Sequence, residues 1–305
     1  MSKNYQKKKR PTLLEVYDCD NEKFRLRVGK DRAASSYAKL LQSRRYVEQF
    51  LNEAHQLTDI PLTELTPQFI NDFSTWLSIE RSLRGGTIWL VCQHLKGVVA
   101  RAHQRGWLPA NPFAQFHIAK NIRPREYLTE PELKLLIEHA FDKSHLAYAR
   151  DLFVFAALTG LSFVDLQNLQ ACHLSSLNGD SWIVAQRHKT KVPYQVKLLP
   201  VPQKILRRCA SKSGGVLFKV PKYRTLAKQI QQVMQECGIS KRITLHCARH
   251  TFAILALNYG VPIESVSRML GHSNITTTQI YARITLQKLD HDMTRFGQEL
   301  KKHLF

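Results

Sequence analysis

Glycines placed after short helical segments constrain the fold of this chain more than any other sequence feature. Apolar residues recur with helical spacing over residues 223–236, 246–259 and 262–270. A glycine follows each segment, at Gly238, Gly260 and Gly271. Glycine often ends a helix because it adopts the left-handed conformation without steric cost. The pattern predicts three short helices joined by tight connections.

A small antiparallel sheet is expected upstream of these helices. Asn178-Gly179 is a strong hairpin signal. We expect strands at 182–184 and 195–199, with a turn region over 189–193 between them. Residues 148–170 have helical spacing that breaks at Thr159-Gly160. The predicted fold class is therefore mostly α with a small antiparallel β-sheet.

Residues 35–116 are expected to form a separate helical domain. Their apolar and aromatic residues recur at helical spacing, Thr66-Pro67 is suited to begin a helix, and Gly106 is suited to end one. The aromatic stripes predict a core. The cations between them fit either a DNA-facing surface or an ordinary solvated helix face.

The remaining segments predict the domain boundaries. Residues 1–34 comprise a basic tail and a short arm, in which residues 22–28 are a candidate strand. Residues 117–128 carry three Lys and Arg residues and one His without periodicity and are expected to be a linker. Thr129 and Glu132 have the spacing of a capping box, so a second domain is expected to cover 129–305, including a helical C-terminal tail.

Positive charge dominates the composition. The 305 residues include 45 Lys and Arg against 24 Asp and Glu, for a formal net charge of +21 and a pI near 9.9. Only five of these cations lie in the first ten residues, so the excess is spread through the chain. Such a charge favours binding to the phosphates of nucleic acid.

Other classes of protein fit the sequence poorly. There is no run of about 18 apolar residues, so no membrane span is predicted. The basic N-terminus lacks the apolar region of a signal peptide. The six cysteines are scattered without a C-x-x-C pair, which is typical of reduced thiols in a cytosolic protein. We expect a cytoplasmic protein associated with the nucleoid.

Four side chains near the C-terminus form a candidate site: His246, Arg249, His272 and Tyr281. Imidazole and guanidinium groups can hold a phosphodiester and neutralise charge on its oxygens. A tyrosine hydroxyl can attack phosphorus and hold it as an ester. The sequence shows neither a metal-ligand set nor a nucleotide-binding loop beside them. We expect transesterification on nucleic acid with no cofactor and no metal.

The spacing of these residues resembles the tyrosine recombinase (phage integrase) family. The family's H-x-x-R, L-G-H and Y motifs are matched by 246–249, 270–272 and Tyr281. The similarity extends back through TGLSFVDL at 159–166 and covers roughly residues 125–290, while 35–116 resembles the family's core-binding domain more loosely. The resemblance implies a two-domain, C-shaped DNA clamp with a helical core-binding domain and an α+β catalytic domain.

The resemblance also implies a role for each residue. Tyr281 is the expected nucleophile, forming a 3′-phosphotyrosyl link, and His246 is the candidate base. Arg249 and His272 are expected to donate hydrogen bonds to phosphate oxygens. Lys189 matches the general acid for the 5′-oxygen, although Lys191 near the same turn is an alternative. Asp165 matches an acidic position that orients a clamp residue, and an ordinary surface acid fits that position equally well.

One position departs from the family pattern. The first motif usually reads T-G-L-R, whereas this chain has Ser162 in place of that arginine. Arg187 is a candidate replacement, because residues two apart on a strand share a face and Arg187 precedes Lys189 by two. Arg268, one helical turn before His272, is a second candidate.

Taken together, these features predict a site-specific DNA recombinase, an integrase acting in integration or excision of a mobile element. Its expected partners are double-stranded DNA, three further copies in a synaptic homotetramer (the free protein being a monomer), and accessory DNA-bending proteins. An apolar stripe after residue 285 is expected to dock on a neighbouring protomer or to pack in cis. The alternatives are a DNA-binding regulator with weak or no catalysis and a type IB topoisomerase.

Overall fold

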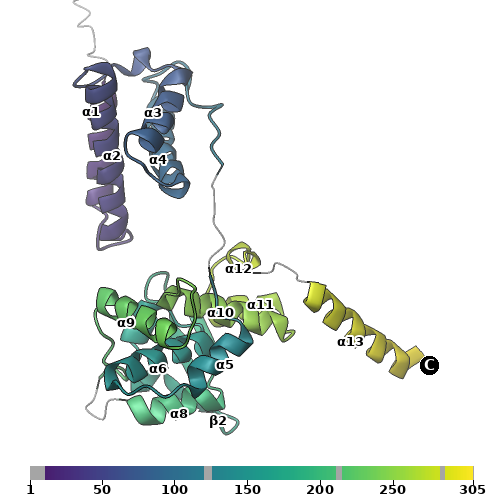
Figure 1. Ribbon diagram of the computed structural model, residues 1–305. Helices are drawn as coiled ribbons and strands as arrows, with labels where there is room; N and C mark the ends of the chain where they lie inside the picture. The colour runs from purple at the N-terminus through teal and green to yellow at the C-terminus, as the bar shows by residue number, and fades with distance from the viewer. Residues whose placement is uncertain (1–10, 120–125, 211–214, 282–285, 305) are drawn as a thin grey trace, which may run out of the picture. The chain divides into compact units, whose positions relative to one another are not determined.

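The computed structural model describes residues 11–119, 126–210, 215–281 and 286–304. The chain divides into two compact units, Met1–Arg123 and Pro124–Phe305 (Figure 1), and each is described by itself.

Within residues 11–119, the first unit contains four α-helices around one core. They are α1 (Leu13–Arg25), α2 (Ala34–His55), α3 (Pro67–Ile79) and α4 (Gly85–Gln104), with a short 3-10 helix at Leu62–Glu64. The Phe50 ring lies at the centre, 5.2 Å from the Phe73 ring and 5.6 Å from the Trp76 ring. The predicted aromatic core of residues 35–116 is confirmed.

Helix α1 corrects the prediction for the N-terminal arm. Residues 22–25 are helical rather than extended, and Leu13 and Tyr17 are fully buried in the same core as Phe50. The predicted strand at 22–28 and the domain start at residue 35 are therefore wrong. The overlooked signal is a capping box at Thr12, closed by the Glu15 carboxylate, which accepts the Thr12 N–H at 3.0 Å.

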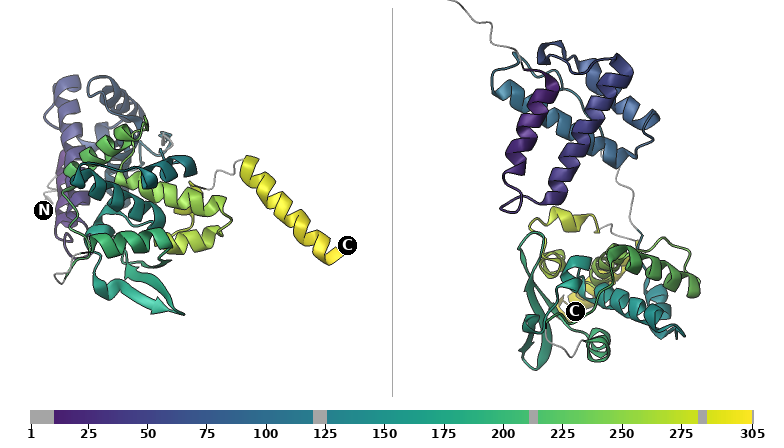
Figure 2. Two further views of the ribbon diagram at one scale, coloured as in Figure 1. Left: turned by 60° about the horizontal axis from the view of Figure 1, so that its bottom comes forward. Right: turned by 90° about the vertical axis from the view of Figure 1, so that its left-hand side faces the viewer.

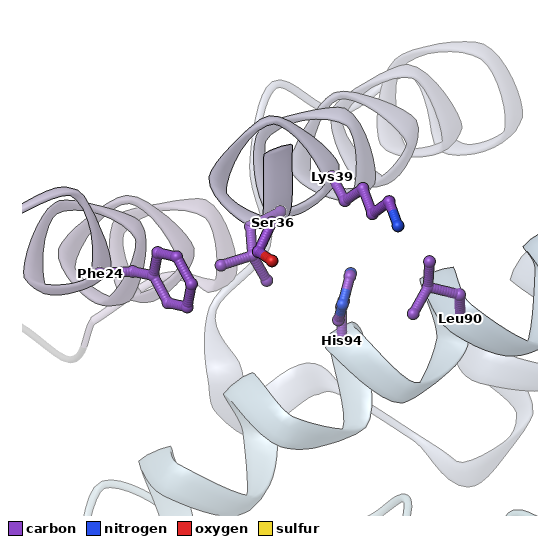
Figure 3. A pocket seen from close by; sticks show the side chains of 6 residues that line it. Phe24, Ser36, Lys39, Leu90 and His94 are labelled. Atoms are coloured by element: carbon purple, nitrogen blue, oxygen red, sulfur yellow. The ribbon is translucent and has the colours of Figure 1, made fainter. Parts of the chain in front are cut away.

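The first unit also contains a cavity of about 230 Å³ between α2 and α4 (Figure 3). Its lining residues are Phe24, Ser36, Lys39, Leu40, Leu90 and His94. The Ser43 Oγ lies 2.7 Å from His94 Nδ1, and burial, together with the cations Lys39 and Arg101, lowers the pKa of His94. His94 is therefore uncharged near neutral pH.

The second unit is mostly helical with one small sheet, as predicted. Strands β1 (Leu174–Leu177), β2 (Asp180–Gln186) and β3 (Pro193–Lys197) form an antiparallel sheet in that order, beside the helices (Figure 2). Asn178-Gly179 joins β1 to β2, with both residues at positive φ. The helices are α5 (Glu130–Glu138), α6 (Ser144–Thr159), α7 (Phe163–Gln167), α8 (Pro200–Cys209), α9 (Tyr223–Glu236), α10 (Leu245–Asn258), α11 (Ile263–Leu270), α12 (Thr276–Gln279) and α13 (Leu286–Leu304).

Local signals explain most of these boundaries. Thr129 begins α5 with the predicted capping box, and Gly160 and Gly271 end α6 and α11 in the left-handed conformation. The sequence prediction missed α8, in which only Pro202 and Ile205 are buried. On α13, Leu289, Met293 and Phe296 are each about half exposed.

Helix α6 is the centre of the second unit. Its residues 152–157 are all buried, and α9 and α10 both pack against it.

No helix in the described residues is both long and apolar enough to cross a bilayer. The same residues contain no group of three His, Cys, Asp or Glu side chains arranged to hold a metal ion. The six cysteines are free thiols.

Gly160 lies at a close approach between helices that leaves no room for a side chain. It has a φ of +71°, and an added Cβ would lie 2.7 Å from Phe252 Cδ1 and 2.9 Å from Leu270 Cδ2. The close approach brings the end of α6 against α10 and α11.

We predict that Gly160→Ala lowers the free energy of unfolding by about 1–2 kcal/mol for the left-handed backbone. Overpacking should lower it by about a further 1–3 kcal/mol. Gly238→Ala is the matched control, because Gly238 has a φ of +68° but no atom within 4 Å of its added Cβ. Urea unfolding measures both variants, and equal losses in the two would show that the close packing at Gly160 contributes nothing.

Candidate active site

Arg249 is a buried cation of α10 that joins the ends of two other helices. Arg249 is only 4% exposed. The Nη1 group donates to the Gly160 carbonyl at 2.7 Å, and Nη2 donates to the Leu270 carbonyl at 2.6 Å. A guanidinium carries more N–H donors than two carbonyls use, so donors remain for an oxygen-rich ligand.

Arg187 reaches the same site from the turn after β2. Residues 188–190 form a turn, closed by the Arg187 N–H donating to Val192 O at 2.8 Å and the Lys191 N–H donating to Arg187 O at 2.8 Å. The premise that 187 and 189 share a strand face is therefore wrong. Arg187 instead forms a half-buried ion pair with Asp165, and its stem packs on Gly271, where an added Cβ would lie 2.6 Å from Arg187 Cγ.

Asp165 contacts both Arg187 and Ser162, the residue that stands where the family usually has an arginine. It is only 6% exposed, so the alternative of an ordinary surface acid is wrong. Its Oδ2 accepts the Ser162 hydroxyl at 2.6 Å, and its Oδ1 accepts the His188 N–H at 3.1 Å. Ser162 is thereby the N-cap of α7, and the Asp165 carboxylate that binds it also binds Arg187.

The two guanidinium groups repel each other across the site. Burial, followed by the charge of Arg187, lowers the pKa of Arg249 to about 10. Tyr281, Asp165 and Tyr194 act in the opposite direction. The site therefore carries two positive charges, and the Asp165 carboxylate neutralises only part of this charge. A bound phosphate would stabilise the arrangement.

His272 is held in the neutral state by burial and by the nearby arginine charges. Burial, then Arg249 and Arg187, lower its pKa from 6.5 to about 4. Its Nδ1 lies 2.8 Å from the Thr278 Oγ1 on α12, which fixes the orientation of the ring. A neutral imidazole keeps one N–H to donate, so His272 can act as a hydrogen-bond donor to an oxygen.

Tyr281 lies among histidine rings just after α12. The His250 ring lies 4.9 Å from the Tyr281 ring at a tilt of 57°, and the His272 ring lies 6.4 Å away and nearly parallel. On α10, the exposed His246 makes an edge contact with His250, with their ring centres 4.7 Å apart. The structure thus brings Tyr281 beside the other candidate side chains.

The remaining predicted residues are exposed. Lys189 and Lys191 are both exposed in the turn after β2, and Arg268 is exposed on α11. Burial and the ion pair to Asp165 therefore favour Arg187 over Arg268 as the second arginine of the site.

Two aromatic residues at the site were missed by the sequence reasoning. His250 is 4% exposed, and its spacing of four from His246 is the signal that would have revealed it. Tyr194 lies on β3, and burial, followed by Asp165, raises the pKa of its hydroxyl to about 12. The sequence gives no comparable signal for Tyr194, because its place depends on the pairing of β2 with β3.

We predict that His272→Gln weakens the dependence of stability on pH. The unfolded state binds a proton at His272 near pH 6.5 but the folded state only near pH 4. The contribution of this group is therefore complete above pH 6.5 and is lost as pH falls towards 4. Urea unfolding of both proteins across this window measures the difference, and equal slopes would contradict the low pKa.

Comparison with known proteins places this geometry in a family. The model of the "Phage integrase family" matches residues 126–288, more than half of the chain, and that of the "Phage integrase SAM-like domain" matches residues 12–119. The tyrosine recombinase XerC of Lactobacillus delbrueckii subsp. bulgaricus is 25% identical over 229 residues, covering 70% of this chain and 77% of that protein. XerA of Saccharolobus solfataricus is 31% identical over 131 residues, covering 42% of this chain and 40% of that protein.

Solved structures show the same fold. The Tn1549 transposon integrase bound to a circular intermediate DNA aligns with a TM-score of 0.74 at 19% identity, covering 93% of this chain and 99% of that one. A lambda integrase dimer bound to a core site aligns with a TM-score of 0.69 at 18% identity, covering 90% and 98%. Because the family model matches more than half of the chain, and because the motifs and the three-stranded sheet agree with it, the chain belongs to the phage integrase family of tyrosine recombinases.

Proposed function

We propose that this protein is a site-specific DNA recombinase that cleaves and rejoins strands through Tyr281. The Tyr281 hydroxyl attacks a backbone phosphorus, the bond from phosphorus to the 5′-oxygen breaks, and a 3′-phosphotyrosyl ester forms. The tyrosine proton passes to a base, and the 5′-oxygen takes a proton from a general acid. Rejoining is the reverse attack by a 5′-hydroxyl, so the phosphoester energy is retained.

The position of Tyr281 near Arg249 and beside the His272 ring is the observation that carries this proposal. The phenol is close enough to Arg249 to affect the pKa of that guanidinium. A phosphate bound to Arg249 would therefore lie within reach of Tyr281, with His272 as a further donor. Preorganised donors of this kind stabilise the charge that develops in the transition state, and in many enzymes they supply most of the rate enhancement.

Arg187 takes the place of the absent family arginine in this proposal. Its charge acts on both Arg249 and His272, so it faces the same phosphate position. Asp165 orients Arg187, which gives the acidic residue the orienting role expected of it. Ser162 contributes through the cap of α7 and keeps the Asp165 carboxylate in place.

Proton transfer is assigned to exposed residues. His246 remains the proposed base and Lys189 the proposed general acid, with Lys191 as its alternative. Lys191 adopts a φ of +58°, so its backbone shapes the turn that carries Lys189. Both lysines are exposed, which suits groups that meet the DNA only when it binds.

The proposed substrate is double-stranded DNA, and the proposed role is integration or excision of a mobile element. The net charge of +21 favours a long phosphate surface. One structural neighbour is a lambda integrase tetramer on a Holliday junction. We propose a homotetramer of this chain on DNA, with the exposed Leu289, Met293 and Phe296 of α13 docking on a neighbouring protomer. Accessory DNA-bending proteins belong to the same proposal.

We predict that Tyr281→Phe binds DNA like the wild type but forms no covalent complex, because only the attacking oxygen is removed. The measurement is an SDS-resistant protein–DNA band on nicked duplexes drawn from a pool of candidate junctions. Tyr259→Phe, a change at an exposed tyrosine at the end of α10, is the matched control and should keep the band. A band that persists in Tyr281→Phe would mean that another nucleophile acts.

We predict that Arg187→Ala slows single-turnover cleavage by about a hundredfold or more, the usual loss for a transition-state donor. Affinity for DNA at matched salt should change little, because such a donor acts mainly on rate. Arg268→Ala removes an exposed arginine of α11 and is the control. Wild-type cleavage by Arg187→Ala would remove Arg187 from the mechanism and make Arg268 the next candidate.

A further inference from the structure

His250 is a buried residue of the site to which the resemblance gives no role. It follows Arg249 on α10 but points elsewhere, because consecutive helical residues do not share a face. Its residue is 4% exposed, and its ring contacts His246 on one side and Tyr281 on the other. The contact with Tyr281 is between ring centres 4.9 Å apart, a spacing typical of packed aromatic pairs.

The backbone at Tyr281 offers little support of its own. Tyr281 follows the four-residue helix α12 and is tied to it by its N–H, which donates to Thr278 O at 3.0 Å. One helical turn is unstable without packing. The aromatic contacts with His250 and His272, together with packing against the apolar cluster of α10 and α11, therefore set where the phenol ring lies.

We propose that His250 is a positioning residue for the nucleophile, holding the Tyr281 ring in its reactive orientation. The proposal rests on the proposed function, in which Tyr281 attacks phosphorus. The rigid, buried ring of His250 is anchored in α10, the helix that also carries Arg249, so it fixes the phenol relative to the phosphate donors. A nucleophile displaced by about 1 Å can lose about a hundredfold in rate.

The same contact joins the nucleophile to its proposed base. His246 and His250 lie four residues apart on α10 and meet edge to face at an interplanar angle of 85°. The His250 ring therefore contacts both the exposed His246 ring and the Tyr281 ring. Movement of His246 when DNA binds would therefore be transmitted to the phenol through His250.

The test compares two substitutions at this position. His250→Ala removes the ring, whereas His250→Phe keeps a flat ring and removes both nitrogens. We expect His250→Ala to slow formation of the covalent complex by about a hundredfold at saturating protein. His250→Phe should recover most of the wild-type rate. Cys247→Ala, a small core change on the same helix, is the control for general loss of packing and should cleave like the wild type.

A second substrate separates nucleophile positioning from the leaving group. Sulfur in place of the 5′-bridging oxygen leaves as a thiolate and needs no general acid, because thiols ionise near pH ~8.5. We expect His250→Ala to remain slow on this substrate, whereas Lys189→Ala should recover. DNA affinity and thermal unfolding, measured in parallel, allow rates to be expressed per folded, bound protein.

Three results would overturn the positioning role. They are a wild-type rate in His250→Ala, a His250→Phe variant as slow as His250→Ala, and recovery of His250→Ala on the sulfur substrate. Each requires that the wild-type protein forms the adduct. Absence of any adduct in the wild type would instead contradict the proposed function.

Discussion

The buried guanidinium of Arg249 is the interaction on which the second unit depends. Two backbone carbonyls, Gly160 O and Leu270 O, hold a charged group that is 4% exposed. Burying a cation without such partners is strongly unfavourable, so the ends of α6 and α11 must stay in contact with α10. That requirement explains why glycine occupies position 160, where a side chain would separate these helices.

A second feature of the site is that it carries more positive than negative charge in the absence of DNA. Arg187 and Arg249 lower the pKa values of their neighbours, and Asp165 balances only part of their charge. In the proposed function, a phosphodiester would supply the missing negative charge between the two guanidinium groups. Burial, together with the charges of Arg249 and Arg187, keeps His272 neutral, so the site holds donors of two kinds, charged and uncharged.

Local sequence signals predicted much of the fold, and long-range contacts account for the rest. The capping box at Thr129, the Asn178-Gly179 hairpin and the glycines after α9, α10 and α11 each depend on a few neighbouring residues. Helix α1 was missed because its capping box follows a basic tail, and α8 because it buries so few residues. Arg187 lies at the site, but not for the predicted reason, since it does not share a strand face with Lys189. An ion pair with Asp165, 22 residues away in sequence, brings it to the site instead. The spacing from His246 indicates that His250 shares its helix face, but the contact of His250 with Tyr281 joins residues far apart in sequence and no local pattern predicts it.

The most direct test of the account is to identify the residue and the DNA end that become joined. The wild-type protein would be trapped on nicked duplexes carrying candidate junctions, digested, and the DNA-linked peptide sequenced by mass spectrometry. The account predicts a peptide in which Tyr281 carries the 3′-phosphate of the cleaved strand, with a free 5′-hydroxyl on the released end. A link through another residue, or through a 5′-phosphate, would contradict it.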